Sequence, residues 1–143
     1  MTRYKAWTGC ALTLVCVALA SCRSAPGQST TRSRIAFAHA LPQLDGTRLE
    51  VKVVEVTYGP GESSTPHRHP CAVIGYVLEG AVRMQVKGEP QATYKTGDSF
   101  YEAPNGVHLV SANASDKERA KFLAYFVCDH QTPLSVAVPD TSK

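Results

Sequence analysis

The sequence lacks the signatures of several common enzyme classes. It contains no phosphate-binding glycine loop, no Cys-x-x-Cys pair and no arrangement of Ser, His and Asp typical of hydrolases. No window shows a convincing helical period. Aromatic residues make up 8% of the chain, and its single tryptophan, Trp7, lies near the start. Nucleotide-dependent, thiol-exchange and serine-hydrolase chemistries are therefore not indicated, and the absence of a helical period favours β-structure.

An excess of positive charge is also missing. The chain has 15 basic and 12 acidic residues, a formal net charge of +3. Two of the basic residues, Arg3 and Lys5, lie in an N-terminal segment that we expect to be removed, which leaves 13 basic against 12 acidic residues and a net charge of +1. No basic patch is present. We therefore expect no nucleic-acid partner.

Residues 1–22 have the pattern of an export signal. A positive start precedes an apolar run, Trp7 to Ala20, that is shorter than the roughly 20 residues needed to cross a bilayer. The run ends in Leu-Ala-Ser-Cys22, which resembles the lipobox of bacterial lipoproteins and implies that Cys22 is acylated. The alternative is ordinary cleavage near Ala20, with Cys22 left as a free thiol. We predict an exported protein, lipid-anchored on the periplasmic side of a bacterial membrane.

The remainder divides into a linker and one domain. Residues 23–40 are rich in Ser, Thr and Arg, which predicts a flexible tether, and residues 41–143 are long enough for a single folded domain. Cys71 and Cys128 would then lie in an oxidising compartment. They could form a disulfide or remain thiols, and Cys71 could also be a soft metal ligand. The sequence leaves these alternatives open.

Short alternating segments predict an all-β domain. Turn signals separate them every several residues, which indicates an antiparallel sandwich or barrel. The alternation changes phase at Val53-Val54, which predicts either a bulge or burial on both faces. The expected strands cover residues 49–57, 72–78, 82–87, 92–95, 99–102, 107–111, 121–128 and 135–138.

Two sequence blocks contain closely spaced histidines. His67 and His69 are two residues apart, and in an extended chain such residues point to the same face, so that both imidazoles can reach one metal ion. The alternative is a solvated His-Arg-His-Pro turn. The second block, Gly97 to His108, contains a third histidine after a short strand and a turn.

Together the two blocks resemble the paired motifs of the cupin superfamily. In the first motif Gly61, His67, His69 and Gly80 fall in register, and in the second Gly97 and His108 do. The resemblance covers about residues 48–128 and implies an all-β cupin jelly-roll barrel within residues 41–143. It also implies that His67, His69 and His108 bind a divalent metal, and that two barrels could pair as a homodimer.

The sequence departs from the motifs at three places. The position of the metal-binding Glu of the family is Val73 here. In the second motif Asn105-Gly106 stands in the turn, where Asn tolerates a left-handed backbone, and Asn113 comes one residue late. Without a carboxylate at position 73, a divalent ion would be uncompensated, and we therefore expect the site to favour an anionic, bidentate small-molecule ligand.

The ligand set restricts the metal and leaves several functions open. Three imidazoles suit Fe, Zn, Cu or Ni more than Mg or Ca, and Mn is a further candidate that cupins use. Glu102 could be a general base and thus catalytic, a hydrogen-bond acceptor, a substitute fourth ligand, or a partly exposed strand residue. The resemblance suggests a dioxygenase acting on a small enolisable or phenolic compound. The alternatives are a metal- or ligand-binding lipoprotein without turnover, and a structural lipoprotein.

Overall fold

The computed structural model describes residues 33–139. The predicted signal at 1–22, the predicted lipidation site Cys22 and residues 23–32 of the predicted tether lie outside the described residues. The chain divides into two compact units, Met1–Ser33 and Arg34–Lys143, and all the strands described below belong to the second. Across residues 33–139 the structure shows no helix that is long and apolar enough to span a bilayer.

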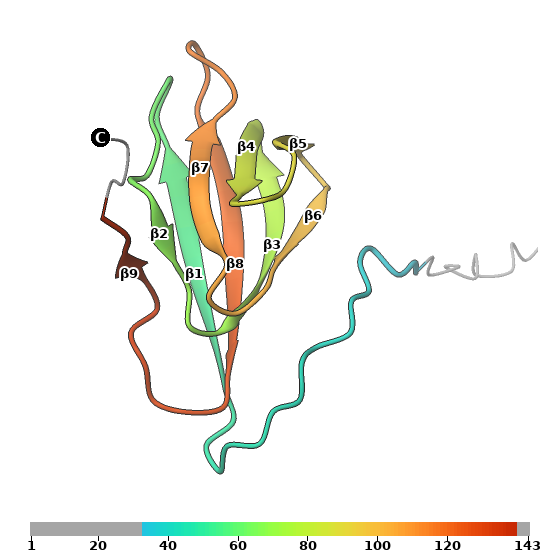
Figure 1. Ribbon diagram of the computed structural model, residues 1–143. Coiled ribbons are helices and arrows are strands. Elements are labelled where there is room, and N and C mark those ends of the chain that lie inside the picture. Colours follow the sequence, from blue (N-terminus) through green and yellow to red (C-terminus); the bar gives the residue numbers. More distant parts are fainter. Residues whose placement is uncertain (1–32, 140–143) are drawn as a thin grey trace, which may run out of the picture. The chain divides into compact units, whose positions relative to one another are not determined.

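Two antiparallel sheets form the second unit (Figure 1). One has the strand order β1-β8-β3-β6 and the other β5-β4-β7-β2-β9, so that the chain passes repeatedly from one sheet to the other. This arrangement confirms the predicted all-β jelly roll. The strands are β1 Glu50–Tyr58, β2 His67–Arg68, β3 Ala72–Glu79, β4 Ala81–Val86, β5 Ala92–Lys95, β6 Ser99–Glu102, β7 Val107–Asn113, β8 Ala120–Cys128 and β9 Val136–Ala137.

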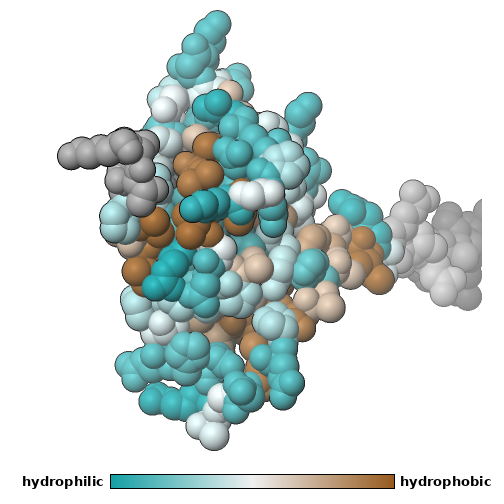
Figure 2. Space-filling model, in the orientation of Figure 1, coloured by the Kyte–Doolittle hydropathy of each residue, from teal (hydrophilic) through white to brown (hydrophobic). Residues whose placement is uncertain are grey.

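The core lies between the sheets and follows the period of two expected for strands. On β8, Phe122, Ala124 and Phe126 are buried and face inward, whereas Leu123 and Tyr125 between them are only partly buried. On β3, Val73 and Val77 are 1% and 0% exposed, so this phase of the strand faces the core. Outside, hydrophilic residues cover most of the face shown in Figure 2, and apolar residues form small groups between them.

Strand β1 corrects one expectation. It pairs with β8 without a break over its whole length, so there is no bulge at Val53-Val54. Val54 packs against the core, while Val53 points outward and is 53% exposed. The change of phase in the sequence arises because the outward face of β1 carries apolar residues at its beginning, which sequence alternation alone cannot distinguish from an inserted residue.

The turn before β7 forms as the sequence indicated. Asn105 has a φ of 63°, in the left-handed region that Asn tolerates. Its backbone N–H donates to the His69 carbonyl at 2.6 Å, and its side-chain oxygen accepts a hydrogen bond from Arg68. The Arg68 side chain is thereby directed to the turn, and the turn is attached to the chain beside His69.

A disulfide joins Cys71 to Cys128. The two residues are 57 positions apart in the sequence, and both are buried. Because its sulfur is bonded to Cys128, Cys71 is not a metal ligand, and that alternative is wrong. The bond links the start of β3 to the end of β8, next to His69 on one side and the segment leading to β9 on the other.

Candidate metal centre

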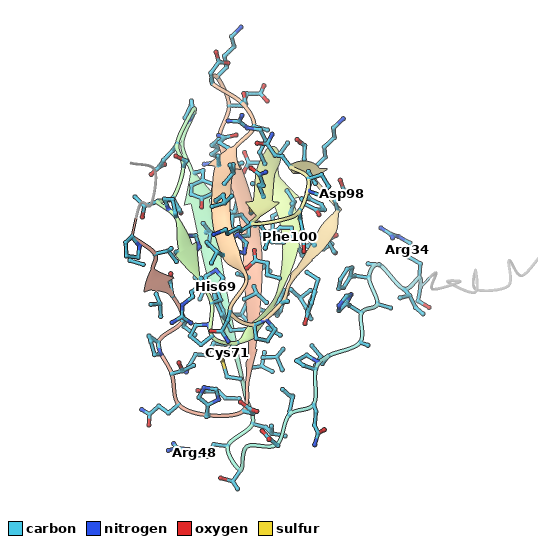
Figure 3. The ribbon with its side chains drawn as sticks, viewed as in Figure 1. Arg34, Arg48, His69, Cys71, Asp98 and Phe100 are labelled. Atoms are coloured by element: carbon cyan, nitrogen blue, oxygen red, sulfur yellow. A yellow bond between two sulfur atoms is a disulfide. The ribbon has the colours of Figure 1, made fainter. Side chains whose placement is uncertain are left out.

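Strand pairing brings the three predicted histidines together. His67 on β2 lies directly opposite His108 on β7, and their ring centroids are 5.3 Å apart. His69 follows β2 immediately, and its ring centroid lies 4.8 Å from that of His67 and 5.5 Å from that of His108. Figure 3 shows the His69 side chain among the inward-pointing side chains of the barrel.

A carboxylate joins this group from the other sheet. In the pairing of β3 with β6, Glu102 is the direct partner of Val73, and directly opposed residues share a face of the sheet. Glu102 is 6% exposed. The acid that the resemblance places at position 73 is therefore present one strand away. This position is compatible with Glu102 being a substitute fourth ligand, one of the roles that the sequence left open.

The distances within the group fit ligands around a common cation. Glu102 Oε2 lies 3.2 Å from His108 Nε2 and 3.4 Å from His69 Nε2. The ligand atoms of these three residues all lie within 4.8 Å of one another, and His67 lies beside this cluster. Ligand atoms about 2.1 Å from one ion, at octahedral or tetrahedral angles, are about 3.0–3.4 Å apart.

Hydrogen bonding does not account for these short approaches. Glu102 Oε2 and both ring nitrogens of His108 are buried and have no hydrogen-bond partner among the described residues, although two of these atoms are 3.2 Å apart. Buried polar atoms without partners are costly, by roughly 1–3 kcal/mol each. A cation between them would satisfy the carboxylate oxygen and one imidazole nitrogen together.

Backbone carbonyls fix the other two imidazoles. His67 Nδ1 donates to the Thr65 carbonyl at 2.7 Å, and His69 Nδ1 donates to the Leu134 carbonyl at 2.6 Å. In the neutral ring each Nε2 is then free to bind a metal. Burial lowers the pKa of His69, against the opposing effects of the Leu134 hydrogen bond and the Glu102 charge. Burial therefore favours the neutral, ligating form.

An inner cavity of about 90 Å³ opens beside the group. His67, His69 and Glu102 line it on one side, and three hydroxyl residues, Tyr58, Ser64 and Ser111, also reach it. Ser64, His67 and His69 also border an open hollow of about 330 Å³. The remaining walls of the inner cavity are apolar: Val56, Val73, Phe122, Ala124 and Phe126.

The two remaining histidines of the chain lie away from this group. The ring of His39 stacks on that of Tyr101, with a centroid separation of 3.7 Å, and His130 is exposed and pairs with Asp129. Sequence reasoning missed the hydroxyl residues and the Leu134 carbonyl. The isolated Ser and Tyr positions carry no motif, and a main-chain carbonyl leaves no signal in sequence at all.

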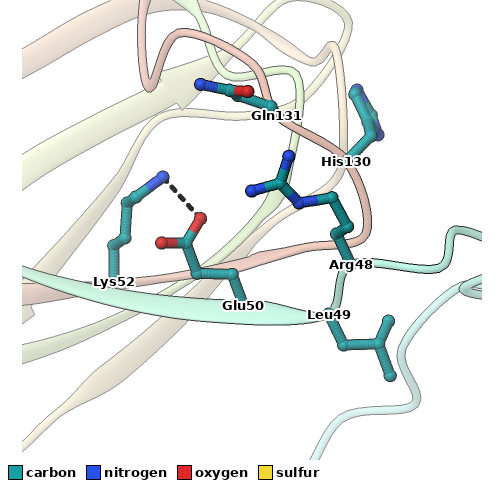
Figure 4. A pocket seen from close by; sticks show the side chains of 6 residues that line it. All are labelled: Arg48, Leu49, Glu50, Lys52, His130 and Gln131. Atoms are coloured by element: carbon teal, nitrogen blue, oxygen red, sulfur yellow. Dashed lines mark ion pairs between the residues drawn. The ribbon is translucent and has the colours of Figure 1, made fainter.

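A larger hollow of about 410 Å³ lies near the beginning of β1 (Figure 4). It is lined by Leu49 and five charged or polar residues, among them Lys52 and Glu50, which form an ion pair at 2.7 Å. His130 is the only histidine that lines it. Its size does not make it the functional site, because its donors do not converge on buried, unpaired atoms as those of the inner cavity do.

The fold has solved counterparts. A cupin-like protein from Thermotoga maritima is 27% identical, with a TM-score of 0.55 over 62% of this chain and 64% of that one. Bacillus subtilis oxalate decarboxylase is 28% identical, with a TM-score of 0.54 over 62% of this chain and 24% of that one. A DMSP lyase from Ruegeria pomeroyi shares the fold at 18% identity, with a TM-score of 0.56 over 65% of this chain and 45% of that one.

The aligned parts span less than two thirds of each of these three proteins. Among curated protein sequences, none matches this chain. Residues 54–126, which contain the three histidines, Glu102 and most of both sheets, match the cupin domain family. That match covers half of the chain, and it agrees with the jelly roll and with the position of the histidines. The chain therefore belongs to the cupin family.

Proposed function

We propose that this protein is an exported cupin that binds one divalent transition metal through His67, His69, His108 and Glu102 and oxidises a small anionic compound with O₂. The observation that carries the proposal is the buried Glu102 carboxylate, which lies 3.2 and 3.4 Å from two imidazole nitrogens without hydrogen-bonding to either. Such an arrangement is unfavourable in the absence of a cation.

The donor set narrows the choice of metal. Three nitrogen donors and one carboxylate suit Mn(II) or Fe(II) better than an all-imidazole set does, since carboxylate is among the ligands that Mn prefers. Mn(II) centres are described for Bacillus subtilis oxalate decarboxylase, whose fold this chain shares. A bound ion of this kind would supply Lewis acidity and a redox partner for O₂.

The charges of the chain's own residues define the ligand. Glu102 contributes one negative charge and the three histidines are neutral when they ligate, so a divalent ion would leave the centre with a charge of +1. A monoanion neutralises it. The apolar walls exclude water from the inner cavity and strengthen this attraction. The Thr65 and Leu134 carbonyls hold the rings of His67 and His69 in place.

Elemental analysis of protein loaded with Mn(II) or Fe(II), and with Zn, Cu or Ni for comparison, tests the centre. His67→Ala, His69→Ala, His108→Ala and Glu102→Ala should each weaken metal binding by about 100-fold, because each removes a ligand. The matched controls are His39→Ala and His130→Ala, which delete histidines outside the group and should leave the metal content unchanged. Stoichiometric metal in the first four variants would refute the assignment.

The pairing of Val73 with Glu102 permits a sharper test. Glu102→Val should lose the metal, and adding Val73→Glu should restore binding in part, because the double variant moves the carboxylate to the directly opposite position. Val73→Glu alone places two carboxylates side by side and should destabilise the metal-free protein. If the double variant binds no better than Glu102→Val, Glu102 does not act as a ligand.

A second candidate function is binding of a metal or small ligand without turnover. It is favoured by the cavity lining, in which Glu102 is the single carboxylate; once it ligates, no acid of this kind remains for proton transfer. O₂ uptake by the metal-loaded protein with a panel of short hydroxy, oxo and enolisable acids separates the two. Full metal occupancy without uptake would favour the binding function.

We also propose that the protein is anchored to the periplasmic side of a membrane through Cys22. The support is the sequence pattern that ends at Cys22, together with the disulfide, which is typical of oxidising compartments. Cys22→Ser should move the full-length chain from the membrane fraction to the soluble periplasmic fraction. Unchanged membrane association of that variant would refute the anchor.

A further inference from the structure

Three hydroxyl groups from three parts of the chain meet at the inner cavity. The Tyr58 hydroxyl, at the end of β1, lies 2.6 Å from Ser64 Oγ and 2.9 Å from Ser111 Oγ. Tyr58 and Ser111 are 5% and 6% exposed, and they belong to different sheets. All three residues line the same cavity as His67, His69 and Glu102. We call Tyr58, Ser64 and Ser111 the hydroxyl cluster.

The hydroxyl cluster has hydrogen-bonding capacity to spare. Three hydroxyls carry three hydrogens, and they form two hydrogen bonds with one another. No further hydrogen bond of these hydroxyls is formed among the described residues. At least one O–H is therefore available to donate. In a cavity whose other walls are apolar, its natural acceptor is an atom of the bound ligand.

The spacing along β7 indicates the length of that ligand. Ser111 lies three residues beyond His108, but the register shifts between them, so that two residues of β4, from Val86 to Met84, span the same stretch. At about 3.3 Å per residue the two positions are roughly 7 Å apart along the sheet. A ligand with about three carbon atoms, bound to the metal at one end and hydrogen-bonded at the other, is in keeping with this spacing and with a cavity of about 90 Å³.

Charge restricts the far end of the ligand. No Lys or Arg lines the cavity, so a second negative charge beside the hydroxyl cluster would be uncompensated. A neutral hydroxyl or carbonyl oxygen can accept the spare hydrogen without this cost. The intervening carbon atoms contact Val56, Phe122 and Ala124, which carry no polar side-chain group.

The geometry points to a second subsite of the centre: Tyr58, Ser64 and Ser111 bind the neutral oxygen at the far end of a short hydroxy or oxo monocarboxylic acid whose carboxylate is bound at the metal. This inference rests on the proposed function, since it needs a metal at His69, His108 and Glu102. It adds the substrate class and three residues that select it.

The test compares three probes of one length by calorimetric titration of Mn(II)-loaded protein. Propionate lacks the distal oxygen, 3-hydroxypropionate has a neutral one, and malonate has a charged one. We expect 3-hydroxypropionate to bind about tenfold more tightly than propionate, which is the effect of one buried hydrogen bond. Malonate should gain no comparable advantage over propionate.

Variants assign the effect to the hydroxyl cluster. Tyr58→Phe and Ser111→Ala should each reduce the preference for 3-hydroxypropionate to about onefold while leaving propionate affinity unchanged. Tyr125→Phe is the matched control, because it removes the same hydroxyl from a β8 residue outside the cavity lining, and it should keep the preference. A purely structural role of Tyr58 would weaken binding of both probes equally.

The outcomes separate the two proposals. Metal bound at full occupancy without a preference for 3-hydroxypropionate, or with a preference that survives in both cavity variants, overturns the subsite and leaves the metal centre intact. Failure to bind metal overturns both. If Tyr58→Phe does not fold, Ser111→Ala and Ser64→Ala still decide, and the comparison of probes on the unaltered protein stands without any variant.

Discussion

The two sheets of the barrel contribute differently to the hydrophobic core and to the candidate metal centre. The sheet β1-β8-β3-β6 has three long strands, contains most of the buried aromatic and aliphatic residues, and is closed by the disulfide. The sheet β5-β4-β7-β2-β9 includes two strands of two residues each, yet His67, His108 and the β9 segment beside them belong to it. Stability is concentrated in the first sheet, which also contributes Glu102, and placement of the histidines depends on the second.

This division predicts that changes in the first sheet act mainly on folding. The largest effect should come from Cys71→Ser combined with Cys128→Ser. The disulfide closes a loop across 57 positions, for which the loop-entropy relation gives a loss of about 4 kcal/mol in the free energy of unfolding. Urea unfolding measures it. The unaltered protein in reductant is the control and should unfold at the same midpoint, whereas a loss below 1 kcal/mol would contradict the prediction.

A smaller effect on folding is expected at Gly75. A Cβ at this position would overlap the ring of Phe100, which is 3% exposed and has little room to move. Gly75→Ala should therefore cost about 1–3 kcal/mol through overpacking. Gly59→Ala is the control, because its Cβ would meet only the end of the Glu62 side chain. Equal unfolding midpoints for the two variants would show that Phe100 can shift freely.

The second sheet should respond in metal affinity more than in stability. A chain ending at Thr132 lacks the Leu134 carbonyl that accepts from His69 and the β9 residues that pair with β2. Its metal affinity should fall by about 10–100-fold, as when an outer partner of a ligating histidine is lost. A chain ending at Pro139 retains both contacts and should bind normally. Competition with a fluorescent chelator measures the metal affinity of both variants. If the chain that ends at Thr132 binds metal as tightly as the chain that ends at Pro139, the second sheet has no special part in metal binding.

The smallest effect is expected outside both sheets. His39→Ala removes a ring that stacks on Tyr101 at 3.7 Å, at an exposed position. Exposed aromatic contacts contribute little, so the free energy of unfolding should fall by no more than about 0.5–1 kcal/mol. Urea unfolding with Phe37→Ala as the neighbouring control measures this contribution. A loss as large as that at Gly75 would mean that the segment before β1 is part of the core.

The contrast between long and short strands also explains which elements could be predicted from the sequence. The long strands were predictable because their inward residues alternate along one segment, as Phe122 and Phe126 do on β8. The histidines were predictable because they lie in two compact motifs. Strand β2 was not predicted, since two residues have no period and it forms through pairing with β7 and β9. The strand predicted at 135–138 is present as the shorter β9, at the edge of its sheet.

Pairs of residues that meet across strands could not be predicted from the sequence. Glu102 was recognised as a candidate, but its position opposite Val73 depends on the register between β3 and β6, which are separated by two intervening strands in the chain. The meeting of Tyr58 with Ser111 depends on contact between the two sheets and spans 53 positions. Local alternation gives the face of a residue but not its partner on another strand.

The carbonyl that orients His69 belongs to Leu134, 65 positions further along the chain. Synthesis runs from the N-terminus, so all three imidazoles are made before the carbonyl that aligns one of them. The proposed metal centre therefore reaches its final geometry only once the segment that contains Leu134 lies beside His69.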